Sequence, residues 1–387
     1  MIMRHIIYLN KVRLDDALPA VNFSLGNAYG IAQTGVRCTF IAQVRSADFD
    51  PDCLYARFDL EPLAGLDVIA RPEQRRFGLK TNQWFYWDAL EQIKALHRET
   101  RVDGIISRDP GALPYLYLLR RQTRIPVFYQ PHNFYADLSL RPDINPKNAM
   151  KYHWLEHHFA GRMNGILCLQ PSQAQLFSQY FPRTRVFPAS PGLLKVYPGK
   201  TPPKNLNRLV YMGSLQPKKG IGVILDAMRN LETDYELLLI GGRNPSEIQA
   251  AQERVQSYQL GHRVKITGWL PFREASLKME SAAVGLLPLR DTFYNRYLTA
   301  PNKLFDYLSR GIPVVASDLP AIRDFLSEDE ACFVPPEDAG RLASAVVALC
   351  RNRKTWNRLS AACLNKAGCF LWKHQAEKMI ASMENSF

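Results

Sequence analysis

Long apolar segments are missing from this sequence. No stretch of the 387 residues approaches the run of about 18 apolar side chains that a membrane-spanning helix needs. The opening MIMRHIIYLN has too short an apolar run for a signal peptide and is more typical of a first strand. We therefore expect a cytoplasmic protein, and any membrane contact to be peripheral, on the inner face of the plasma membrane.

Paired cysteines and metal-binding motifs are also missing. The seven cysteines are odd in number and scattered, and they include no C-x-x-C pair, which is typical of reduced thiols in the cytosol. His153, His157 and His158 include the i, i+4 spacing that a metal can use, but they do not form H-E-x-x-H and have no clear third ligand. We expect these histidines on a packed or surface helix, and we expect no metal site.

Two common glycine-rich nucleotide motifs are absent. No G-x-x-x-x-G-K-[ST] segment occurs, which argues against a P-loop nucleotidase. Gly26, Gly30 and Gly35 follow the first apolar run, but their spacing is not that of the G-x-G-x-x-G dinucleotide fingerprint. The missing fingerprint argues against an enzyme that uses a nicotinamide or flavin cofactor, and no cofactor is expected. RNP-type aromatic motifs, zinc fingers and basic helical runs are missing too, which argues against nucleic acid as a partner.

The composition favours two domains and an anionic partner. A chain of this length with 47% hydrophobic residues can bury two cores of ordinary size. Lys and Arg number 49 against 36 Asp and Glu, which gives a net charge of +13. On charge alone, the partner can be nucleotide phosphate, nucleic acid or an acidic lipid surface.

Short β-rich apolar runs alternate with amphipathic segments of helical length, which predicts α/β domains with parallel sheets. A stretch rich in proline, glycine and lysine at 190–205 predicts a linker between two such domains. We expect an N-terminal domain at 1–195, the linker at 196–207, a C-terminal domain at 208–352, and helices at 353–387 that brace both domains. The runs expected to form strands are His5 to Leu9, Cys38 to Ala42, Asp103 to Ser107, Pro126 to Gln130, Asn164 to Leu169, Arg208 to Met212, Tyr235 to Ile240, Arg263 to Thr267, Val284 to Pro288 and Ile312 to Ala316.

Glycine turns follow three of the strands expected in the second half. Such turns expose backbone N–H groups, and lysines beside the first turn supply positive charge for a diphosphate. Ligands of an open parallel sheet bind beyond the carboxyl ends of its strands, where all these turns are expected. A single glycine is better explained by a tight turn, but several converging turns favour a ligand site. The turns are at Gly213, followed by Lys218, Lys219 and Gly220, at Gly241 and Gly242, and at Gly268.

The segment TAPNKLFDYLSRGIPVVASDLPAI, residues 299–322, predicts a loop, a helix and a buried strand. Pro301 suits the first turn of the helix, and Gly311 ends it. Lys303 and Asp306 are three residues apart near the helix N-terminus, where backbone N–H groups favour an anion. A phosphate would meet an ammonium and N–H donors there, and a solvated ion pair between the two side chains is the alternative.

Residues 208–334 resemble the donor-binding domain of the GT-B glycosyltransferases, especially glycosyltransferase family 4. The family's G-[RS]-L-x-x-x-K-G motif is matched by GSLQPKKG at 213–220, and its V-x-F-x-G turn is matched by VKITG at 264–268. Its acidic residue five positions before the glycine of G-x-P-V-V is matched by Asp306, before GIPVV. The first domain is similar only in layout. The resemblance implies two Rossmann-like parallel-sheet domains facing across a cleft.

The resemblance also implies an activity. It is that of a retaining, metal-independent glycosyltransferase, which moves a sugar from a nucleoside-diphosphate sugar, UDP- or GDP-linked, to a carbohydrate or lipid-linked acceptor in polysaccharide or glycolipid biosynthesis. Lys219 and Lys303 would stabilise the leaving diphosphate, and Asp306 would accept hydrogen bonds from the ribose. The segment from Pro301 to Tyr307 is similar to that of a subgroup that builds bacterial surface polysaccharides.

Two positions depart from the family pattern. Ser214 stands where many members have an arginine, so Lys219 would be the remaining diphosphate ligand of that turn. Leu298 stands where the first Glu of an E-x7-E pair contacts the donor sugar, which puts sugar selection by that contact in doubt. The implied donor-binding residues are Gly213, Ser214, Lys219, Gly242, Gly268, Asn302, Lys303, Leu304 and Asp306.

The first domain offers candidates for the acceptor side. His132 directly follows a predicted strand in the sequence FYQPHNFYADL, and family members often have a histidine in such a loop near the donor sugar and acceptor. It would donate a hydrogen bond or relay a proton, and a structural histidine in a turn is the alternative. Gly30, Asp109 and Asn133 complete the acceptor-side set.

An aromatic run is the candidate for membrane contact. Trp84, Phe85, Tyr86 and Trp87 follow the basic residues Arg75, Arg76 and Lys80, and aromatic and basic groups together suit a headgroup interface. Packing of these aromatics under the first sheet is the alternative.

Two other functions are compatible with parts of the pattern. A nucleotide-sugar epimerase or hydrolase can share the fold, but it needs acid/base carboxylates and histidines that are sparse here. A non-catalytic protein that binds anions or membranes would follow from the charge alone.

Overall fold

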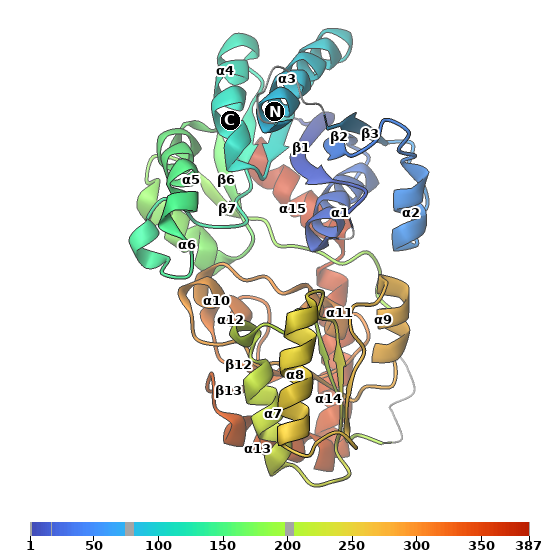
Figure 1. Ribbon diagram of the computed structural model, residues 1–387. Helices are drawn as coiled ribbons and strands as arrows, with labels where there is room; N and C mark the ends of the chain where they lie inside the picture. Colours follow the sequence, from blue (N-terminus) through green and yellow to red (C-terminus); the bar gives the residue numbers. More distant parts are fainter. Residues whose placement is uncertain (1, 17, 74–80, 198–204, 387) are drawn as a thin grey trace. The chain divides into compact units, whose positions relative to one another are not determined.

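The computed structural model describes residues 2–16, 18–73, 81–197 and 205–386. Its internal contacts divide the chain into two units (Figure 1). The first unit combines Met1–Leu194 with Phe370–Phe387, and the second is Lys195–Cys369. Most of the predicted linker at 196–207 lies outside the described residues. The predicted C-terminal segment is divided, since its last helix belongs to the first unit.

The first unit contains a seven-stranded parallel sheet in the order β3-β2-β1-β4-β5-β6-β7. The central strands are almost fully buried because helices cover both faces, which accounts for their continuous apolar runs. The strands are β1 (His5–Arg13), β2 (Arg37–Val44), β3 (Leu66–Pro72), β4 (Gly104–Ser107), β5 (Val127–Tyr129), β6 (Gly165–Cys168) and β7 (Val186–Pro188).

Helices of the first unit follow its strands in chain order. Several begin with a proline in the first turn, and the Asn145 side chain caps the fifth helix by accepting a hydrogen bond from the Lys147 N–H at 3.0 Å. The helices are α1 (Pro19–Gln33), α2 (Asp52–Phe58), α3 (Thr81–Glu99), η1 (Pro110–Ala112), α4 (Leu113–Thr123), η2 (Leu138–Leu140), α5 (Pro146–Phe159), η3 (Ala160–Arg162), α6 (Pro171–Tyr180) and α15 (Trp372–Glu384).

Helix α15 completes the first unit from the far end of the chain. Its Trp372 packs against Gly26 and Gly30 of α1, and a Cβ atom added at Gly30 would lie 2.5 Å from the Trp372 carbonyl oxygen. Gly192, which precedes the second unit, contacts the same indole. Close helix packing therefore explains the glycine at position 30, and its acceptor-side role stays a prediction.

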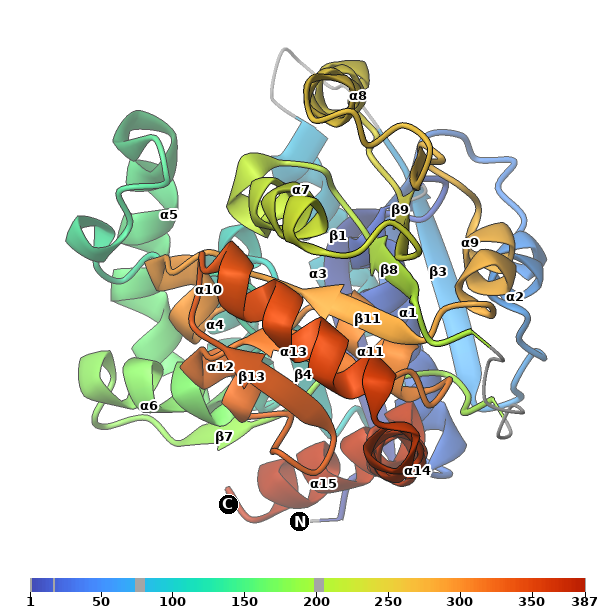
Figure 2. The ribbon, with the colours of Figure 1, turned by 90° about the horizontal axis from the view of Figure 1, so that it is seen from below.

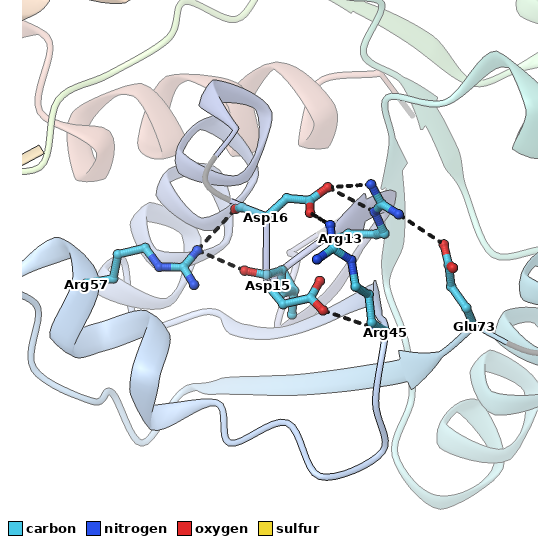
Figure 3. Close-up of polar contacts among 7 residues, drawn as sticks. Arg13, Asp15, Asp16, Arg45, Arg57 and Glu73 are labelled. Atoms are coloured by element: carbon cyan, nitrogen blue, oxygen red, sulfur yellow. Dashed lines mark hydrogen bonds and ion pairs between the residues drawn. The ribbon is translucent and has the colours of Figure 1, made fainter. Parts of the chain in front are cut away.

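A network of charged side chains joins the carboxyl ends of three strands in the first unit (Figure 3). Arg13, at the end of β1, pairs with Asp16 at 2.8 Å and with Glu73, which follows β3, at 3.7 Å. Arg45, which follows β2, reaches Asp16 at 2.5 Å, and Arg57 of α2 donates to the Asp16 carbonyl at 3.1 Å. The network ties strand ends and α2 to one another, and we assign it a structural role.

The second unit contains a six-stranded parallel sheet in the order β10-β9-β8-β11-β12-β13. Both units thus have the doubly wound strand order in which the first strand lies beside the second on one side and the fourth on the other. The strands are β8 (Arg208–Met212), β9 (Glu236–Ile240), β10 (Val264–Ile266), β11 (Val284–Leu287), β12 (Val314–Ser317) and β13 (Ala331–Val334).

Helices α7 and α13 pack side by side on one face of this sheet, and α11 packs against α14 (Figure 2). The helices are η4 (Pro217–Lys219), α7 (Ile221–Asn230), α8 (Pro245–Ser257), α9 (Phe272–Met279), α10 (Phe293–Tyr297), α11 (Asn302–Leu308), α12 (Pro320–Arg323), α13 (Ala339–Arg351) and α14 (Arg353–Cys369).

Candidate active site

The strand order of the second unit places a ligand crevice at one point. Strands β8 and β11 are neighbours in the sheet. From β8 the chain continues to β9 on one side of this pair, and from β11 it continues to β12 on the other side. Loops diverge at such a switch point and open a crevice beyond the carboxyl ends of the strands. The turn after β8 and the residues after β11 border this crevice.

The predicted glycine turns lie together at this edge of the sheet. The Gly213 N–H donates to the Ile240 carbonyl at 2.8 Å, the Gly242 N–H to the Gly213 carbonyl at 3.1 Å, and the Gly241 N–H to the Gly268 carbonyl at 2.9 Å. All four glycines have φ values between +71° and +133°. The turns after β8, β9 and β10 are therefore joined by hydrogen bonds into one surface.

Lys303, in the first turn of α11, reaches this surface. Its ammonium lies 3.5 Å from the centroid of the Tyr211 ring, and a Cβ atom at Gly213 would lie 3.1 Å from its Nζ atom. Nζ is buried and makes no hydrogen bond within the part of the chain that the structure describes. The alternative of a solvated ion pair with Asp306 is therefore wrong.

The two predicted lysines influence each other. Burial is the main cause that lowers the pKa of Lys303 well below its usual range, and the charge of Lys219 is the second. Lys219 is half-buried in η4, with its ammonium 5.6 Å from the Tyr294 ring centroid, and burial followed by Lys218 lowers its pKa too. Two ammonium groups that repel each other are thus held near the glycine turns.

Tyr307 fixes the helix that carries Lys303. Its hydroxyl accepts a hydrogen bond from the Met212 N–H at 3.1 Å and donates to the Val210 carbonyl at 3.4 Å. Its ring occupies the space beside Gly285 of β11, where an added Cβ would lie 2.6 Å from the ring. Tyr307 was not predicted as a site residue, although its position one residue after Asp306 in the motif was a signal.

Glu247 of α8 was also missed, and it organises the turn after β8. Its carboxylate accepts hydrogen bonds from the Ser214 hydroxyl at 3.1 Å, the Leu215 N–H at 3.2 Å and the Gln216 side chain at 3.0 Å. Ser214, which replaces the arginine of many family members, is therefore held by a carboxylate. No periodicity in the sequence pairs residues 214 and 247.

The remaining predicted donor-side residues lie on or near α11. Asp306 is partly buried, and desolvation raises its pKa to about 6, with the Arg310 guanidinium opposing the shift. Asn302 is exposed at the start of the helix, whereas Leu304 is fully buried and serves the core. Leu298, at the position of the first Glu of other members, is buried as well.

In the first unit, His132 lies in the turn after β5. The side chain is exposed to solvent, and desolvation, with the charge of Arg108 as the second cause, lowers the pKa of His132. The Asn133 side chain is used within the same turn, since it accepts from the Phe134 N–H at 3.0 Å and donates to the Tyr135 hydroxyl at 2.9 Å. An acceptor contact by Asn133 would compete with these bonds.

Asp109 follows β4 and caps the η1 turn. Its carboxylate accepts a hydrogen bond from the Gly111 N–H at 2.8 Å and another from the Tyr86 hydroxyl. Burial raises the pKa of Asp109, although both hydrogen bonds oppose the shift. These contacts give Asp109 a structural role, and its proposed contact with an acceptor stays a prediction.

Glu156 of α5 anchors the segment that begins with His132. It is fully buried, and its carboxyl group accepts hydrogen bonds from the Tyr129 hydroxyl at 2.8 Å and the Tyr135 N–H at 2.5 Å. Desolvation outweighs these bonds and raises the pKa of Glu156 to about 7. This buried acid was not predictable from local pattern, because it lies among the histidines of a helix with a polar sequence.

The raised pKa of Glu156 predicts a pH dependence of stability. Between its unfolded pKa near 4.5 and about 7, the native state holds a proton that the unfolded state has lost, so the free energy of unfolding falls as pH rises. This contribution is about 3 kcal/mol across that window. Urea unfolding between pH 4.5 and 8 should show a flatter profile for Glu156→Gln than for the wild type. Glu253→Gln, at an exposed position, is the control, and equal slopes in all three proteins would contradict the assignment.

The three histidines of α5 do not assemble a metal site. His153 bonds to the Tyr135 carbonyl at 2.7 Å, and His158 stacks on Trp154 with ring centroids 4.8 Å apart. Within the described ranges, no group of three or more His, Cys, Asp or Glu side chains has a geometry that could hold a metal ion.

The aromatic residues of the run in α3 differ in their burial. Phe85 and Tyr86 are buried, as the core interpretation has it, whereas Trp87 is 48% exposed and packs edge-on against Tyr115 of α4 at 5.5 Å. The basic residues at 75, 76 and 80 lie outside the described residues. Across the part of the chain that the structure describes, no helix has the length and apolar character needed to cross a bilayer.

Two Rossmann-like units with parallel sheets, one of which carries lysines at joined glycine turns, define the GT-B class of fold. The solved structure of HepE from Anabaena in complex with UDP-glucose has this fold; it superposes with a TM-score of 0.71 over 99% of this chain and 100% of that chain, at 14% identity. The likeness at this identity supports the fold alone.

Family comparisons identify both units. The Glycosyltransferase Family 4 model matches residues 28–192, and the Glycosyl transferases group 1 model matches residues 207–352. The chain therefore belongs to the GT-B glycosyltransferases, with a family 4 domain first and a group 1 domain second. The first domain, in which the sequence showed only a similar layout, matches as well.

Two curated relatives match part of the chain. Phosphatidyl-myo-inositol mannosyltransferase of Mycobacterium leprae is 31% identical over 180 residues, which are 44% of this chain and 44% of the relative. Amylovoran biosynthesis glycosyltransferase AmsK of Erwinia amylovora is 27% identical over 147 residues, 37% of this chain and 35% of the relative. Each match spans less than half of the relative's length.

Proposed function

We propose that this protein transfers a sugar, with retention of anomeric configuration and without a metal ion, from a UDP- or GDP-linked donor to a carbohydrate or lipid-linked acceptor. The observation that carries the proposal is the buried Lys303 ammonium, which has no hydrogen-bond partner among the described residues and lies beside the Gly213 turn. A desolvated cation is costly unless an anion pairs with it. The donor diphosphate is the anion that fits a GT-B domain.

The chemistry of the proposed step explains two lysines. The bond between the anomeric carbon and the diphosphate oxygen breaks, its electron pair stays on that oxygen, and the acceptor hydroxyl attacks from the same face while its proton passes to the departing phosphate. Negative charge grows on the diphosphate in this transition state. Fixed ammonium groups at Lys219 and Lys303 stabilise that charge without reorganisation, which is the role that a metal ion has in other transferases.

Asp306 suits the ribose of the nucleotide. With its pKa raised to about 6 by desolvation, its carboxyl group is mostly ionised at pH 7 and can accept hydrogen bonds from two adjacent hydroxyl groups. His132, neutral in its lowered-pKa state, can donate a hydrogen bond from the first domain. We propose that the pathway is the synthesis of a polysaccharide or glycolipid, as the names of both curated relatives support.

Nucleotide binding tests the proposed donor site. In a thermal-shift experiment with UDP, GDP, ADP and TDP, either UDP or GDP should raise the melting temperature by about 3 °C or more at saturating concentration, because it binds only the folded protein. The same nucleotide-linked sugar should then label an acceptor pool in the presence of EDTA, and NMR of the product should show the donor's anomeric configuration. Conversion of the donor without acceptor would indicate an epimerase or hydrolase, and a reaction that EDTA abolishes would refute metal independence.

We also propose that the protein is cytoplasmic and that its first unit contacts an acidic membrane peripherally. Exposed apolar side chains occur on α3, α4 and α5, helices that pack against one another in this order, and Arg121 on α4 is exposed as well. The protein should sediment with vesicles that contain phosphatidylglycerol, and Trp87→Ser should weaken this association severalfold, whereas Trp269→Ser in the second unit should not. Equal sedimentation of all three proteins would contradict the proposal. The exposed apolar residues are Trp87 (48%), Leu118 (49%), Met150 (57%) and Trp154 (52%).

A further inference from the structure

A hollow of about 470 Å³ lies in the first unit between the C-terminal ends of α5 and α6. Its volume is within the range of small-molecule sites. Four of its lining residues carry basic side chains, and no lining residue is acidic. Tyr180 and Thr184 add hydroxyl groups. The basic residues are His157, His158, Arg162 and Arg183.

Among the described residues, the two arginines of the hollow have no acidic partner. Neither Arg162 nor Arg183 forms an ion pair with any carboxylate in the described part of the chain, and both are exposed. Other surface arginines of this protein do form such pairs, for example Arg323 with Asp318 at 2.7 Å and Arg254 with Asp226 at 2.9 Å. The hollow therefore concentrates charge that no ion pair neutralises among the described residues, and the Arg162 guanidinium also lies 5.4 Å from the Tyr117 ring centroid.

Helix dipoles explain only part of this charge. The carbonyl ends of α5 and α6 favour cations, but each end carries the equivalent of about half a negative charge, so together they balance about one of the two arginines. One lining residue contacts an acid, because the Tyr180 hydroxyl donates a hydrogen bond to the Asp137 carboxylate at 2.7 Å. The same carboxylate accepts a hydrogen bond from the Ser139 N–H at 2.9 Å. Asp137 does not line the hollow.

The hollow is separate from the ligand-facing edge of the first sheet. Helices α5 and α6 end here and lead into the amino ends of β6 and β7, whereas His132 follows the carboxyl end of β5. Its walls are fixed, because the Thr184 hydroxyl donates to the Gly161 carbonyl at 2.9 Å and the Arg162 carbonyl accepts from Arg120 at 2.7 Å. A ligand in this hollow would not be the group that reacts.

We propose that this hollow is a second anion site, which takes a phosphate monoester or diphosphate group carried either by a lipid headgroup or by a soluble sugar phosphate. Two guanidinium groups offer paired donors that match phosphate oxygens, and the imidazoles add further polar contacts. The Tyr180 and Thr184 hydroxyl groups already donate to Asp137 and to the Gly161 carbonyl, so the arginines carry most of the binding. Phe181 and Pro182 form an apolar wall against which a sugar ring or a glycerol backbone packs.

The test uses a signal from the hollow itself, because pyrophosphate also suits the proposed donor site. In the full-length protein with ¹³C-labelled histidine, titration with pyrophosphate should shift the resonances of His157 and His158 saturably, each assigned with its His→Gln variant. Arg162→Gln/Arg183→Gln should weaken this shift at least about tenfold, whereas Arg273→Gln, an exposed residue of the second unit, should not. Both substitutions are at exposed positions, and an unchanged melting temperature confirms that the double variant folds.

Vesicles distinguish the two sources of the phosphate. Sedimentation of the protein is compared between phosphatidylcholine vesicles with and without about 20% phosphatidic acid, a lipid that gives the vesicle a dense surface of phosphate monoesters. If the Arg162→Gln/Arg183→Gln variant no longer binds the phosphatidic acid vesicles, the ligand is a lipid headgroup. If the variant still binds these vesicles but loses the histidine shift with pyrophosphate, the ligand is a soluble phosphate. Two results together would show that the site does not exist. Pyrophosphate would cause either no saturable histidine shift or the same shift in the double variant, and vesicle binding would not depend on the two arginines.

Discussion

Replacing Lys303 with methionine should lower turnover by about a hundredfold to a thousandfold and at the same time stabilise the fold. The ammonium is buried over the Tyr211 ring and has no hydrogen-bond partner in the described structure, so in the free protein only the cation–π contact offsets its desolvation. Removing it should raise the free energy of unfolding by about 1 to 3 kcal/mol. Opposite signs for activity and stability are expected only of a residue kept for its ligand.

Steady-state kinetics and urea unfolding of the same preparations measure both effects. Lys218→Met is the matched control, because Lys218 is exposed in the same turn and should change turnover by less than about threefold. Lys219→Met should resemble Lys303→Met in activity. If Lys303→Met keeps full turnover, the diphosphate assignment and the function built on it fail together; if it unfolds the protein, the ammonium is structural.

Alanine at position 220 should destabilise the second unit by about 4 kcal/mol or more. Gly220 has a φ of +81°, and a Cβ atom there would lie 1.7 Å from the Pro288 carbonyl oxygen. The left-handed conformation and the collision each cost about 1–3 kcal/mol, and backbone cannot move aside as a flexible side chain can. The turn that carries Lys219 would also leave the end of β11, so activity should fall as well.

Thermal and urea unfolding of Gly220→Ala, with Gly261→Ala as the control, test this prediction. A Cβ atom at Gly261 meets nothing within 4 Å, and its φ is not in the left-handed region, so its substitution should change stability by less than about 0.5 kcal/mol. Similar stabilities for the two variants would show that the turn after β8 can shift without cost.

The sequence predicted the interior of both sheets and one edge strand, β10, but missed the other three edge strands. All ten expected strands are present, whereas β3, β7 and β13 were missed. These three are edge strands, with a partner on one side only, and none has a long continuous apolar run; β13 is apolar but only four residues long. β3 carries Asp67 and Arg71, and β7 is three residues long and ends in a proline.

The candidate site was predictable where one segment carries both the backbone geometry and the charge. The glycines after β8, β9 and β10 and the Lys303 helix were identified because parallel strands must end at the same edge. Glu247 and Tyr307 were not, since their roles depend on partners 31 to 33 and 95 to 97 residues away. Contacts of this kind are set by tertiary packing, which no local pattern encodes.

The position of α15 has a consequence for synthesis of the protein in the cell. The pocket that Gly26, Gly30 and Gly192 leave for Trp372 stays unfilled until the ribosome has made the chain beyond the second unit. The amino-terminal domain is translated first, but it cannot complete its core before the carboxy-terminal domain has emerged. Until then an apolar groove of the nascent chain is exposed and accessible to chaperones.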